Sequence, residues 1–393
     1  MKVCLMTSVY ALSESDRNGS FLVESTRYLK ERGHEVKVFA PSYEGLADHH
    51  IEGVPVHRFR YFFKKFENLT HGQGAPNRIR NPLYLLVAFF YILFGLISAV
   101  RFCRREKFDV IHVHWPFPHG MWGWAASKLS GAPIVLTFHG AELLLAKKFF
   151  FVDAFLKHAI KHSEGIICNS TFTAAEVAKL TDKPINVIPF GVTVNVKEKN
   201  ATRNGDTHNL LFAGRIIERK GLEYLIRAIP LMDDELAVHL NIAGEGNVKA
   251  SLQALTTELG LDDKITFHGF VPNAQLEDMY SQADVFILPA IVDDRGDTEG
   301  LGVVLVEALS YQVPVVASQV GGIPDVIIDG ETGTLVPERS PEAIAEAVES
   351  LLRDDERASE MVDKGLAHAR SYFDWGRITD LLVQTYKKAL GQL

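Results

Sequence analysis

The strongest constraint on the fold of this chain is an alternation of short apolar, β-branched runs with helical stretches, and the alternation occurs twice. In the first half, strands are predicted at Lys2 to Tyr10, Val36 to Ala40, Val56 to Tyr61, Val110 to His114, Pro133 to Phe138, Gly165 to Asn169 and Val187 to Pro189. In the second half, they are predicted at Leu210 to Ala213, His239 to Ala243, Ile265 to Phe267, Val285 to Leu288, Val313 to Ala317 and Gly333 to Val336. Continuously apolar strands separated by helices are typical of parallel, doubly wound α/β sheets. Two such sheets in tandem predict two Rossmann-like domains with ligands bound beyond the carboxyl ends of the strands, in a cleft between them.

The helices of the first half are expected at Phe21 to Arg32, Leu83 to Val100 and Met121 to Leu129, and an irregular polar loop at Leu69 to Asn81. A polar stretch from Lys197 to His208 reads as a linker between the two sheets. We therefore expect an N-terminal domain at 1–195 and a C-terminal domain at 196–372. The segment 373–393 contains a last helix, Trp375 to Leu390, which is expected to pack back on the first domain.

Composition limits the class of protein. The chain has 393 residues, 47% of them hydrophobic and 23% charged, which fits a folded globular protein of two domains. Its formal charge of −8 argues against general nucleic-acid binding. Three widely spaced cysteines, Cys4, Cys103 and Cys168, indicate a reducing compartment and no structural zinc. No signal peptide fits the N-terminus, so a cytoplasmic location is expected.

The segment from Leu83 to Val100 carries no charge, and arginines stand on both sides of it, at 78, 80, 101, 104 and 105. Its length is at the lower limit for a membrane span. Spanning would place the strands before and after it on opposite sides of a bilayer, although they read as parts of one sheet. A buried helix and a helix lying in the membrane surface both stay open, the second as peripheral attachment through 83–105. The aromatic and basic runs Tyr61 to Phe66 and Lys147 to Phe151 add to the membrane-surface interpretation.

The stretch from Asp297 to Tyr311 predicts a loop that leads into a helix. Gly300 and Gly302 permit close approach of a ligand to the backbone, and a helix N-terminus favours phosphate. Glu299 and Glu307 would lie roughly 12 Å and about 80° apart on a continuous helix, so they are not expected to act as one acid/base pair. They are interpreted as contacts to different parts of one elongated ligand, although acidic residues near a helix start are also common without any ligand.

A second basic turn follows the strand that ends at Ala213. Gly214-Arg215 comes directly after the strand, and Lys220-Gly221 opens the next helix. Arg215 and Lys220 could both reach a diphosphate placed near the helix that starts at Gly302. Solvated basic residues in a loop are the plainer alternative.

These motifs together resemble a retaining glycosyltransferase of family 4. The resemblance rests on Glu299-Gly-Leu-Gly-Val-Val-Leu-Val-Glu307, Ala213-Gly-Arg-Ile-Ile-Glu-Arg-Lys-Gly221, Ala243-Gly-Glu-Gly246, Phe267-His-Gly-Phe270 and Val320-Gly-Gly-Ile-Pro-Asp325. In the first half it rests on Gly19, Arg32-Gly-His-Glu-Val36, Thr137-Phe-His-Gly140 and Ile188-Pro-Phe-Gly-Val192. It covers essentially the whole chain and implies the GT-B fold, with two Rossmann-like domains facing a central cleft.

The resemblance also implies roles for individual residues. Glu299 would contact the transferred sugar, and Glu307 would bind the ribose of a nucleotide-sugar donor. Arg215 and Lys220 would hold the diphosphate and stabilise the charge of the leaving group. His139 would touch the donor sugar near the reacting carbon. Backbone contacts to the donor would come from Gly19, Gly300, Leu301 and Gly302, and contacts to the base from Gly269 and Phe270.

Four positions depart from the family pattern. The first loop has Asn18-Gly19 where two adjacent glycines are usual, which leaves its phosphate contact open. Ala141-Glu142 has a longer acid than the usual Asp, Phe190 stands where Asn is common, and Ala290 stands where Ser is frequent.

Metal chemistry has little support in the sequence. His112 and His114 alternate onto one face of a strand and His119 follows, but no carboxylate or cysteine stands at ligand spacing, so packing or cleft-lining roles are favoured. No Asp-x-Asp lies at a strand end. The implied enzyme is therefore metal-independent and needs no cofactor.

The sequence thus predicts a retaining hexosyltransferase that uses a UDP-sugar by default, with a GDP-sugar close behind. A lipid-linked acceptor in cell-surface polysaccharide or glycolipid synthesis is favoured by the apolar segment, and a soluble acceptor such as a sugar phosphate is the alternative. A nucleotide-sugar epimerase of the same fold would need a proton-abstracting pair near the sugar, and none is evident. A non-catalytic binding partner is disfavoured because the set of Glu299, Glu307, Arg215, Lys220 and His139 is intact.

Overall fold

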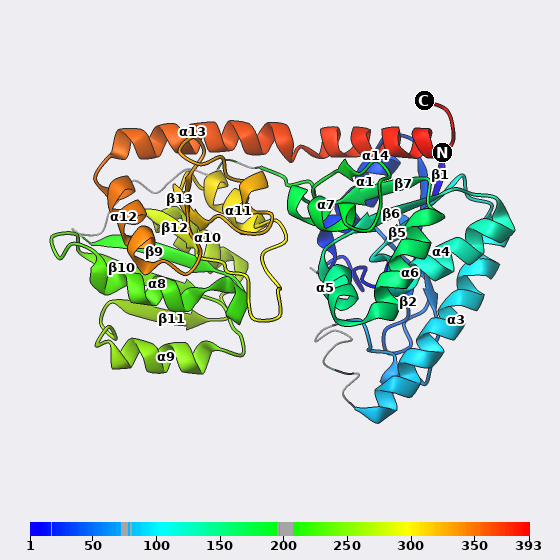
Figure 1. Cartoon of the computed structure of the whole chain (residues 1–393), viewed down its shortest axis with the longest axis horizontal. Helices are drawn as coiled ribbons and strands as arrows, with labels where there is room; N and C mark the ends of the chain where they lie inside the picture. The colour runs from blue at the N-terminus through cyan, green and yellow to red at the C-terminus, as the bar shows by residue number, and fades with distance from the viewer. Residues whose placement is uncertain (17, 72–77, 79–80, 195, 197–206) are drawn as a thin grey trace. The chain divides into compact units, whose positions relative to one another are not determined.

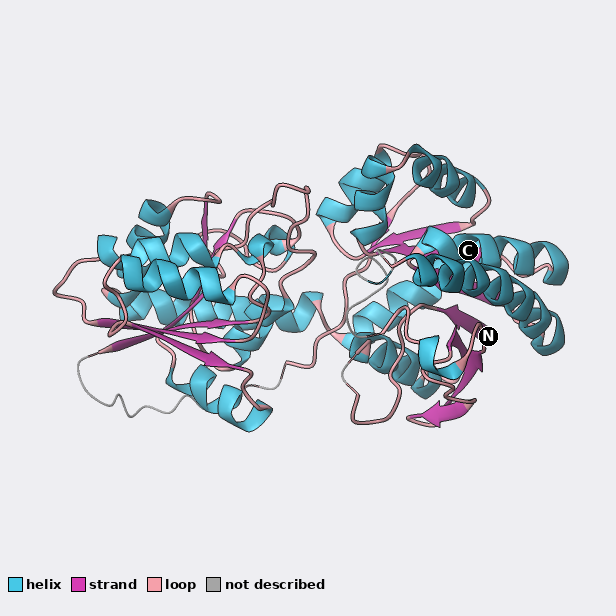
Figure 2. Ribbon diagram, turned by 90° about the horizontal axis from the view of Figure 1, so that it is seen from below, coloured by secondary structure: helices cyan, strands magenta, loops and turns pink. Residues whose placement is uncertain are grey.

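The computed structural model describes the chain except for residues 17, 72–77, 79–80, 195 and 197–206. The chain divides into two compact units, Met1–Gly191 with Trp375–Leu393, and Val192–Asp374 (Figure 1). Each contains one sheet with helices packed on it (Figure 2). Most of the predicted linker, and most of the polar loop predicted from Leu69 to Asn81, lie outside the described residues.

The first unit is built on an eight-stranded sheet in the order β3-β4-β2-β1-β5-β6-β7-β8. Its strands are β1 (Lys2–Met6), β2 (Glu35–Pro41), β3 (His49–Ile51), β4 (Val54–Phe59), β5 (Val110–His114), β6 (Ile134–Phe138), β7 (Gly165–Cys168) and β8 (Asn186–Val187). All neighbouring pairs are parallel except β3 and β4. Because β1 lies between β2 and β5, the order of strands reverses there, which makes the carboxyl ends of β1 and β5 the switch point where ligands bind in such sheets.

Two details of this sheet differ from the prediction. The first strand ends at Met6 rather than Tyr10, since its pairing with β2 and β5 stops there and the Thr7 side chain forms a local turn with Val9. The β3–β4 hairpin was not predicted. Its two turn residues, Glu52 and Gly53, have φ of 49° and 67°, the conformation that a tight antiparallel hairpin requires.

Helices cover both faces of the first sheet. They are α1 (Ser20–Glu31), α3 (Pro82–Glu106), α4 (Pro116–Ser130), α5 (Ala141–Lys148), α6 (Phe150–Lys161), α7 (Thr171–Ala178) and α14 (Trp375–Ala389), with a short 3₁₀ turn η1 (Lys64–Phe66). Alternate residues of β1 point to opposite faces. Cys4 and Met6 join the core with α3, α4 and α6, whereas Val3 and Leu5 join the core with α1 and α14. The helices α5, α6 and α7 were missing from the prediction.

Helix α3 is longer than predicted at both ends. Pro82 occupies its first turn, the Asn81 side chain accepts a hydrogen bond from the Leu83 backbone N–H, and Lys107 ends the helix with φ of 53°. One face is buried at Val87, Tyr91, Gly95, Ala99, Phe102 and Cys103. A Cβ on Gly95 would lie 2.2 Å from the Trp122 ring of α4, so the glycine allows this close packing.

The opposite face of α3 is apolar and exposed. Its large exposed side chains are Leu83, Leu85, Leu86, Phe89, Leu93 and Phe94. Among the described residues α3 is the single helix long and apolar enough to span a membrane by length and composition, and only 22% of its most apolar window is buried. However, β1, β2 and β4 precede α3 and β5 to β8 follow it in the same sheet. A bilayer crossing by α3 would divide that sheet, so the crossing is incompatible with this fold.

Helix α14 belongs to the first unit although it is the last element of the chain. Its first residue, Trp375, stacks on Tyr28 of α1 with ring centroids 5.4 Å apart. The same indole ring would lie 2.2 Å from a Cβ at position 191, which accounts for the glycine of the Ile188 to Val192 motif. Asp380 pairs with Arg32 at 2.9 Å.

The second unit has a six-stranded, all-parallel sheet in the order β11-β10-β9-β12-β13-β14. The strands are β9 (His208–Ala213), β10 (Val238–Ala243), β11 (Ile265–Gly269), β12 (Val285–Leu288), β13 (Val315–Ser318) and β14 (Thr334–Val336). The helices are α8 (Leu222–Ala228), α9 (Lys249–Glu258), α10 (Asn273–Gln282), α11 (Val303–Ser310), α12 (Pro341–Leu352) and α13 (Asp355–Tyr372), and 3₁₀ turns span Glu218–Lys220 (η2), Ile229–Leu231 (η3) and Ile323–Asp325 (η4). The order reverses between β9 and β12, so the loops after these two strands meet at the switch point.

Candidate active site

The switch point of the second unit brings Lys220 and Glu299 together. Lys220 ends the turn η2 after β9, and Glu299 lies in the loop between β12 and α11. Lys220 Nζ is 2.5 Å from Glu299 Oε2, and the side chains are 8% and 13% exposed. Two residues that the sequence predicted to serve the same ligand therefore form a nearly buried ion pair.

Arg219 completes this cluster and was not predicted. Its Nη1 donates to the Thr298 carbonyl at 2.9 Å and lies 3.2 Å from Glu299 Oε2, while its Nε is 3.4 Å from Asp297. The Ile291 N–H donates to the Arg219 carbonyl at 2.9 Å. Arg219 thus ties the turn after β9 to the loop after β12. The only signal in the sequence was its position beside Lys220 in the quoted motif.

The cluster keeps its members charged. Burial lowers the pKa of Lys220, and the nearby carboxylate of Glu299 opposes that shift. Burial alone would raise the pKa of Glu299, but the charges of Lys220 and Arg219 outweigh it and hold the pKa below its ordinary value. At neutral pH the site therefore presents a carboxylate held between two cations.

Glycines fix the loops that carry this cluster. A Cβ on Gly221 would lie 1.9 Å from the Pro289 carbonyl oxygen. On Gly321 it would lie 2.0 Å from the carbonyl oxygen of Glu299, and on Gly322 it would lie 2.1 Å from that of Gly300. The Gly322 N–H also donates to the Glu299 carbonyl at 2.9 Å. The Val320 to Asp325 motif therefore serves to hold the Glu299 loop at the end of β12.

Helix α11 starts directly after this loop. Gly302 caps it with φ of 83°, and Leu301 is buried. Glu307 lies on the helix, where Tyr280 Oη donates to its Oε2 at 3.3 Å. The Glu307 residue is exposed, but the contact of its carboxyl with the buried Tyr280 desolvates it in part and raises its pKa. Glu299 and Glu307 thus have different partners.

The other predicted donor residues of this unit lie on loops or strand ends at the carboxyl edge of the sheet. Arg215 follows β9 and is exposed. Gly269 ends β11 with φ of 71°, and a Cβ there would lie 2.8 Å from Glu245 Oε1. Phe270 is 81% exposed. The structure does not bring Gly269 or Phe270 into contact with Lys220, since β10 separates β11 from β9.

The first unit places His139 in an aromatic surrounding at the end of β6. Its ring stacks on Trp115 with centroids 4.2 Å apart and on Phe190 at 5.5 Å. Its Nε2 is 3.0 Å from His114 Nδ1. Burial lowers the pKa of His139 to about 3, so the ring is neutral at physiological pH. Its Nδ1 is buried without a partner among the described residues.

Sequence reasoning did not associate Trp115 with His139, and it treated Phe190 only as a departure from the family pattern. In the structure Phe190 also packs on Phe21 of α1, with ring centroids 4.1 Å apart. Gly19, the predicted phosphate contact, caps α1 one residue before it begins, with φ of 75°. A Cβ on Gly19 would lie 3.3 Å from the Val9 carbonyl oxygen.

Glu142 fixes the backbone at His139. Its Oε1 accepts the His139 N–H at 2.8 Å, and the residue is only 2% exposed. Burial raises the pKa of Glu142 to about 7, against the effect of the backbone N–H groups that it accepts. The longer acid at this position therefore orients the turn after β6.

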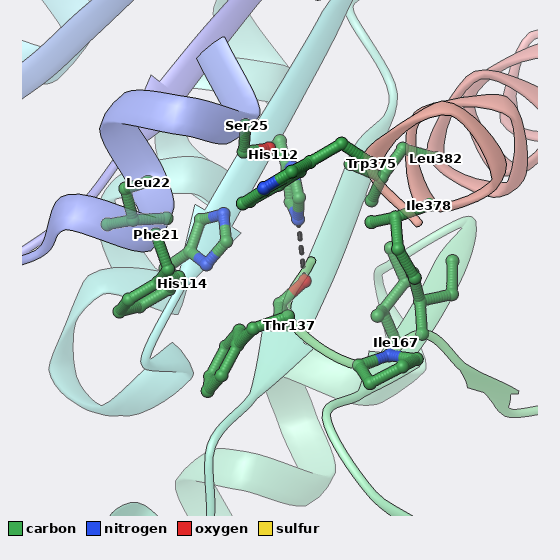
Figure 3. A pocket seen from close by; sticks show the side chains of 13 residues that line it. Phe21, Leu22, Ser25, His112, His114, Thr137, Ile167, Trp375, Ile378 and Leu382 are labelled. Carbon is green, nitrogen blue, oxygen red and sulfur yellow. Dashed lines mark hydrogen bonds between the residues drawn. The ribbon is translucent and has the colours of Figure 1, made fainter. Parts of the chain in front are cut away.

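A cavity of about 30 Å³, with room for one water-sized molecule, lies beside His112, His114, Thr137 and Trp375 (Figure 3). The two nitrogens of His112 are 2.6 Å from Thr137 Oγ1 and 2.7 Å from Tyr386 Oη of α14.

His119 Nδ1 is 2.8 Å from the Trp115 carbonyl and its Nε2 is 2.9 Å from Tyr91 Oη. The three histidines considered as metal ligands thus pack and hydrogen-bond within the first unit. Within the part of the chain that the structure describes, no three His, Cys, Asp or Glu side chains form a candidate metal site.

Comparison with known protein families identifies both halves of the chain. The model described as Glycosyltransferase Family 4 matches residues 19–196, and the model described as Glycosyl transferases group 1 matches residues 195–368. Together they cover both units.

Relatives and a solved structure agree. The chain is 36% identical over 184 residues to the GDP-mannose-dependent α-(1-6)-phosphatidylinositol monomannoside mannosyltransferase of Mycolicibacterium smegmatis, covering 45% of this chain and 48% of that one. It is 28% identical over 396 residues to the D-inositol 3-phosphate glycosyltransferase of an Arthrobacter species, covering 93% and 88%. The Anabaena protein HepE, solved in complex with UDP, has a similar fold, with a TM-score of 0.73, 17% identity, and coverage of 98% and 99%.

Proposed function

This chain belongs to glycosyltransferase family 4, and from that premise we propose that it transfers a hexosyl unit from a UDP- or GDP-sugar to a lipid-linked acceptor at the cytoplasmic face of a membrane. As a member of the family it is a retaining hexosyltransferase that uses a nucleotide-sugar donor. The proposal concerns the roles of single residues, the acceptor and its location. The observation that carries the acceptor is the exposed apolar face of α3.

The cluster at the switch point of the second unit suits the donor. When the bond between sugar and diphosphate breaks, negative charge grows on the leaving phosphate, and fixed cations at that place stabilise the transition state. We assign this role to Lys220 and Arg215, supported by the start of α11. Glu299 keeps Lys220 charged in spite of burial and offers its carboxylate to the sugar hydroxyls. Glu307 binds the ribose.

His139 contacts the donor sugar as a neutral hydrogen-bonding group. A ring with a pKa of about 3 cannot serve as a general base that is regenerated at neutral pH. No carboxylate is assigned as a covalent nucleophile. We therefore propose front-face attack, in which the leaving phosphate takes the proton of the acceptor hydroxyl, the new bond forms on the face that the diphosphate leaves, and no metal takes part.

The acceptor class is supported by two features. The exposed face of α3 is apolar, and arginines stand at both ends of the helix. The Mycolicibacterium relative is named for a phosphatidylinositol monomannoside acceptor, which is a lipid. The Arthrobacter relative is named for D-inositol 3-phosphate, a soluble acceptor, and this class is the second candidate. A nucleotide-sugar epimerase would turn over donor without any acceptor.

The test is donor hydrolysis and thermal shift against a panel of UDP- and GDP-sugars, with and without membrane lipid extract. One nucleotide sugar is expected to raise the melting temperature, and lipid is expected to convert slow hydrolysis into transfer. Transfer to inositol phosphates without lipid would favour the soluble acceptor. Absence of any shift or turnover, with Glu299→Ala and Lys220→Ala unchanged from wild type, would contradict the assigned site.

A further inference from the structure

We propose that a groove between the segment Arg60–Phe63 and helix α3 binds one hydrocarbon chain of a lipid that carries a phosphate headgroup. Its lining residues are Arg60, Tyr61, Phe62, Phe63, Phe90 and Phe94. The inference rests on the proposed lipid-linked acceptor and deepens it, because it names the place where the chain of that acceptor lies.

The groove is built from stacked and tilted aromatic rings. Phe62 and Phe90 have ring centroids 5.6 Å apart, and Phe90 stacks on Phe94 at 5.7 Å. Phe63 is 72% exposed and Phe94 is 42% exposed, so two of these rings offer their surfaces to solvent. The volume is about 400 Å³, within the range of small-molecule sites, and the lining is apolar apart from Arg60. Such a site matches a flexible hydrocarbon chain better than a polar ligand.

Arg60 supplies the polar end of the groove. Its Nε lies 2.7 Å from both carboxylate oxygens of the buried Glu67, and its Nη2 donates to the Phe62 carbonyl at 3.3 Å. These bonds fix the guanidinium and leave its Nη1 without a partner among the described residues. The exposed Lys64 and Lys65 follow in η1. A phosphate placed at this end would therefore meet a fixed guanidinium and two mobile cations.

The charge around α3 favours a lipid over a protein as the occupant. From Asn68 to Arg105 there is no acidic residue and there are five arginines, in a chain whose formal charge is −8. The groove continues the exposed face of α3, whose Leu85 and Leu86 are 58% and 48% exposed. A continuous apolar face with basic ends is the arrangement by which a helix lies on an anionic membrane. A chain leaving that membrane would reach the groove without crossing water.

The test separates the groove from the rest of the apolar face. The groove variant is Phe63→Ser with Phe94→Ser, and the matched control is Leu85→Ser with Leu86→Ser, which exposes similar apolar area on α3 outside the groove. Monomeric decyl phosphate, kept below its micelle concentration, is titrated by calorimetry into each full-length protein. We expect saturable binding that is weakened about tenfold or more in the groove variant, through lost apolar burial, and changed less than about twofold in the control.

Further ligands and readouts assign the outcomes. Inorganic phosphate at the same concentration is expected not to bind, and decanol is expected to bind more weakly than decyl phosphate. Equal binding of decyl phosphate by the wild type and both variants would overturn the groove. So would a wild-type dimer in sedimentation that the groove variant abolishes without any decyl phosphate binding, because the face would then be a contact between copies of the chain. Donor hydrolysis in the same variants is expected to stay at the wild-type rate. If the wild type binds decyl phosphate but turns over no nucleotide sugar, the proposed function fails and the groove stands.

Discussion

The switch points of the two units have opposite chemistry. In the second unit, the ends of β9 and β12 carry a nearly buried cluster of charges, Arg219, Lys220 and Glu299. In the first unit, the ends of β5 and β6 carry neutral rings, with His139 between Trp115 and Phe190. The comparison shows how one type of sheet is adapted to different tasks: fixed charge suits a group whose charge changes during the reaction, whereas neutral rings suit a sugar, which is recognised by shape and hydrogen bonds.

The largest effect is expected at the charged cluster. Lys220→Ala should lower kcat/KM for the donor by about 100- to 1,000-fold, the usual cost of removing one preorganised donor to developing negative charge. Arg215→Ala, at the exposed position, is expected to cost less. The measurement is steady-state turnover of the best nucleotide sugar, with the melting temperature as a check of folding. A Lys220→Ala protein that is folded and as active as wild type would remove the charge-based role of this unit.

The neutral site can be examined with two substitutions at one position. His139→Phe keeps an aromatic ring but loses both nitrogens, whereas His139→Asn keeps polar groups and loses the stacking on Trp115. We expect His139→Phe to lower kcat/KM by about 10- to 100-fold, in the range of one hydrogen bond to a sugar, with His139→Asn less affected. The wild-type rate should show no ionisation of His139 between pH 5 and 8, because its pKa is about 3. If His139→Phe retains full activity, the ring acts by packing alone.

The positions of most strands and the Glu299 loop were predictable because they depend on local patterns. Runs of apolar residues identify buried parallel strands, and Gly300 and Gly302 mark a loop before a helix. The stacking of Trp115 and Phe190 on His139 was not predictable, since these residues are far apart in sequence and meet only when β5, β6 and the segment after β8 are aligned. Arg219 was missed for the same reason: its partners lie 78 to 80 positions later, and a basic residue in a turn has no local mark of burial.

The helices that were missed also have a physical explanation. Helix α6 starts with Phe150 and Phe151, which read as part of an aromatic and basic surface run rather than as a helix start. Helix α3 was predicted as a whole, but which of its faces is buried depends on Trp122 meeting Gly95. Its apolar residues surround the helix, so periodicity alone could not distinguish the two faces.

The neutral histidines of the first unit should also make stability depend on pH. Burial lowers the pKa of His112 to about 3, below the ordinary value near 6.5. The unfolded chain then binds a proton that the folded chain does not, so stability is complete above pH 6.5 and falls as the pH drops from there toward 3. His112→Gln, which can still hydrogen-bond to Thr137 and Tyr386 but cannot ionise, should reduce this slope by about 1.4 kcal/mol per pH unit.

Glu142 acts in the opposite direction, because its pKa is raised to about 7 and its contribution to stability is lost as the pH rises through that value. Urea unfolding at pH 5, 6 and 7, followed by a signal from the first unit such as Trp122 fluorescence, measures the sum. Equal slopes for the wild type and His112→Gln would mean that His112 is protonated in the folded protein.

The smallest effect is expected where the neutral site meets α14. Tyr386→Phe removes the hydroxyl that lies 2.7 Å from His112 Nδ1 and leaves that nitrogen buried without this partner. The free energy of unfolding should fall by about 1–3 kcal/mol, the cost of one unsatisfied buried polar group. Tyr28→Phe is the matched control, since Tyr28 stacks on Trp375 in the same region and should lose little without its hydroxyl.

Donor hydrolysis by Tyr386→Phe should stay near the wild-type rate, because Tyr386 does not contact His139 directly. A loss of activity without a loss of stability would instead mean that the chain of contacts from Tyr386 through His112 and His114 sets the position of His139. That result would join α14 to the neutral site as a functional element, and the contrast between the two switch points would then extend beyond the residues at the strand ends.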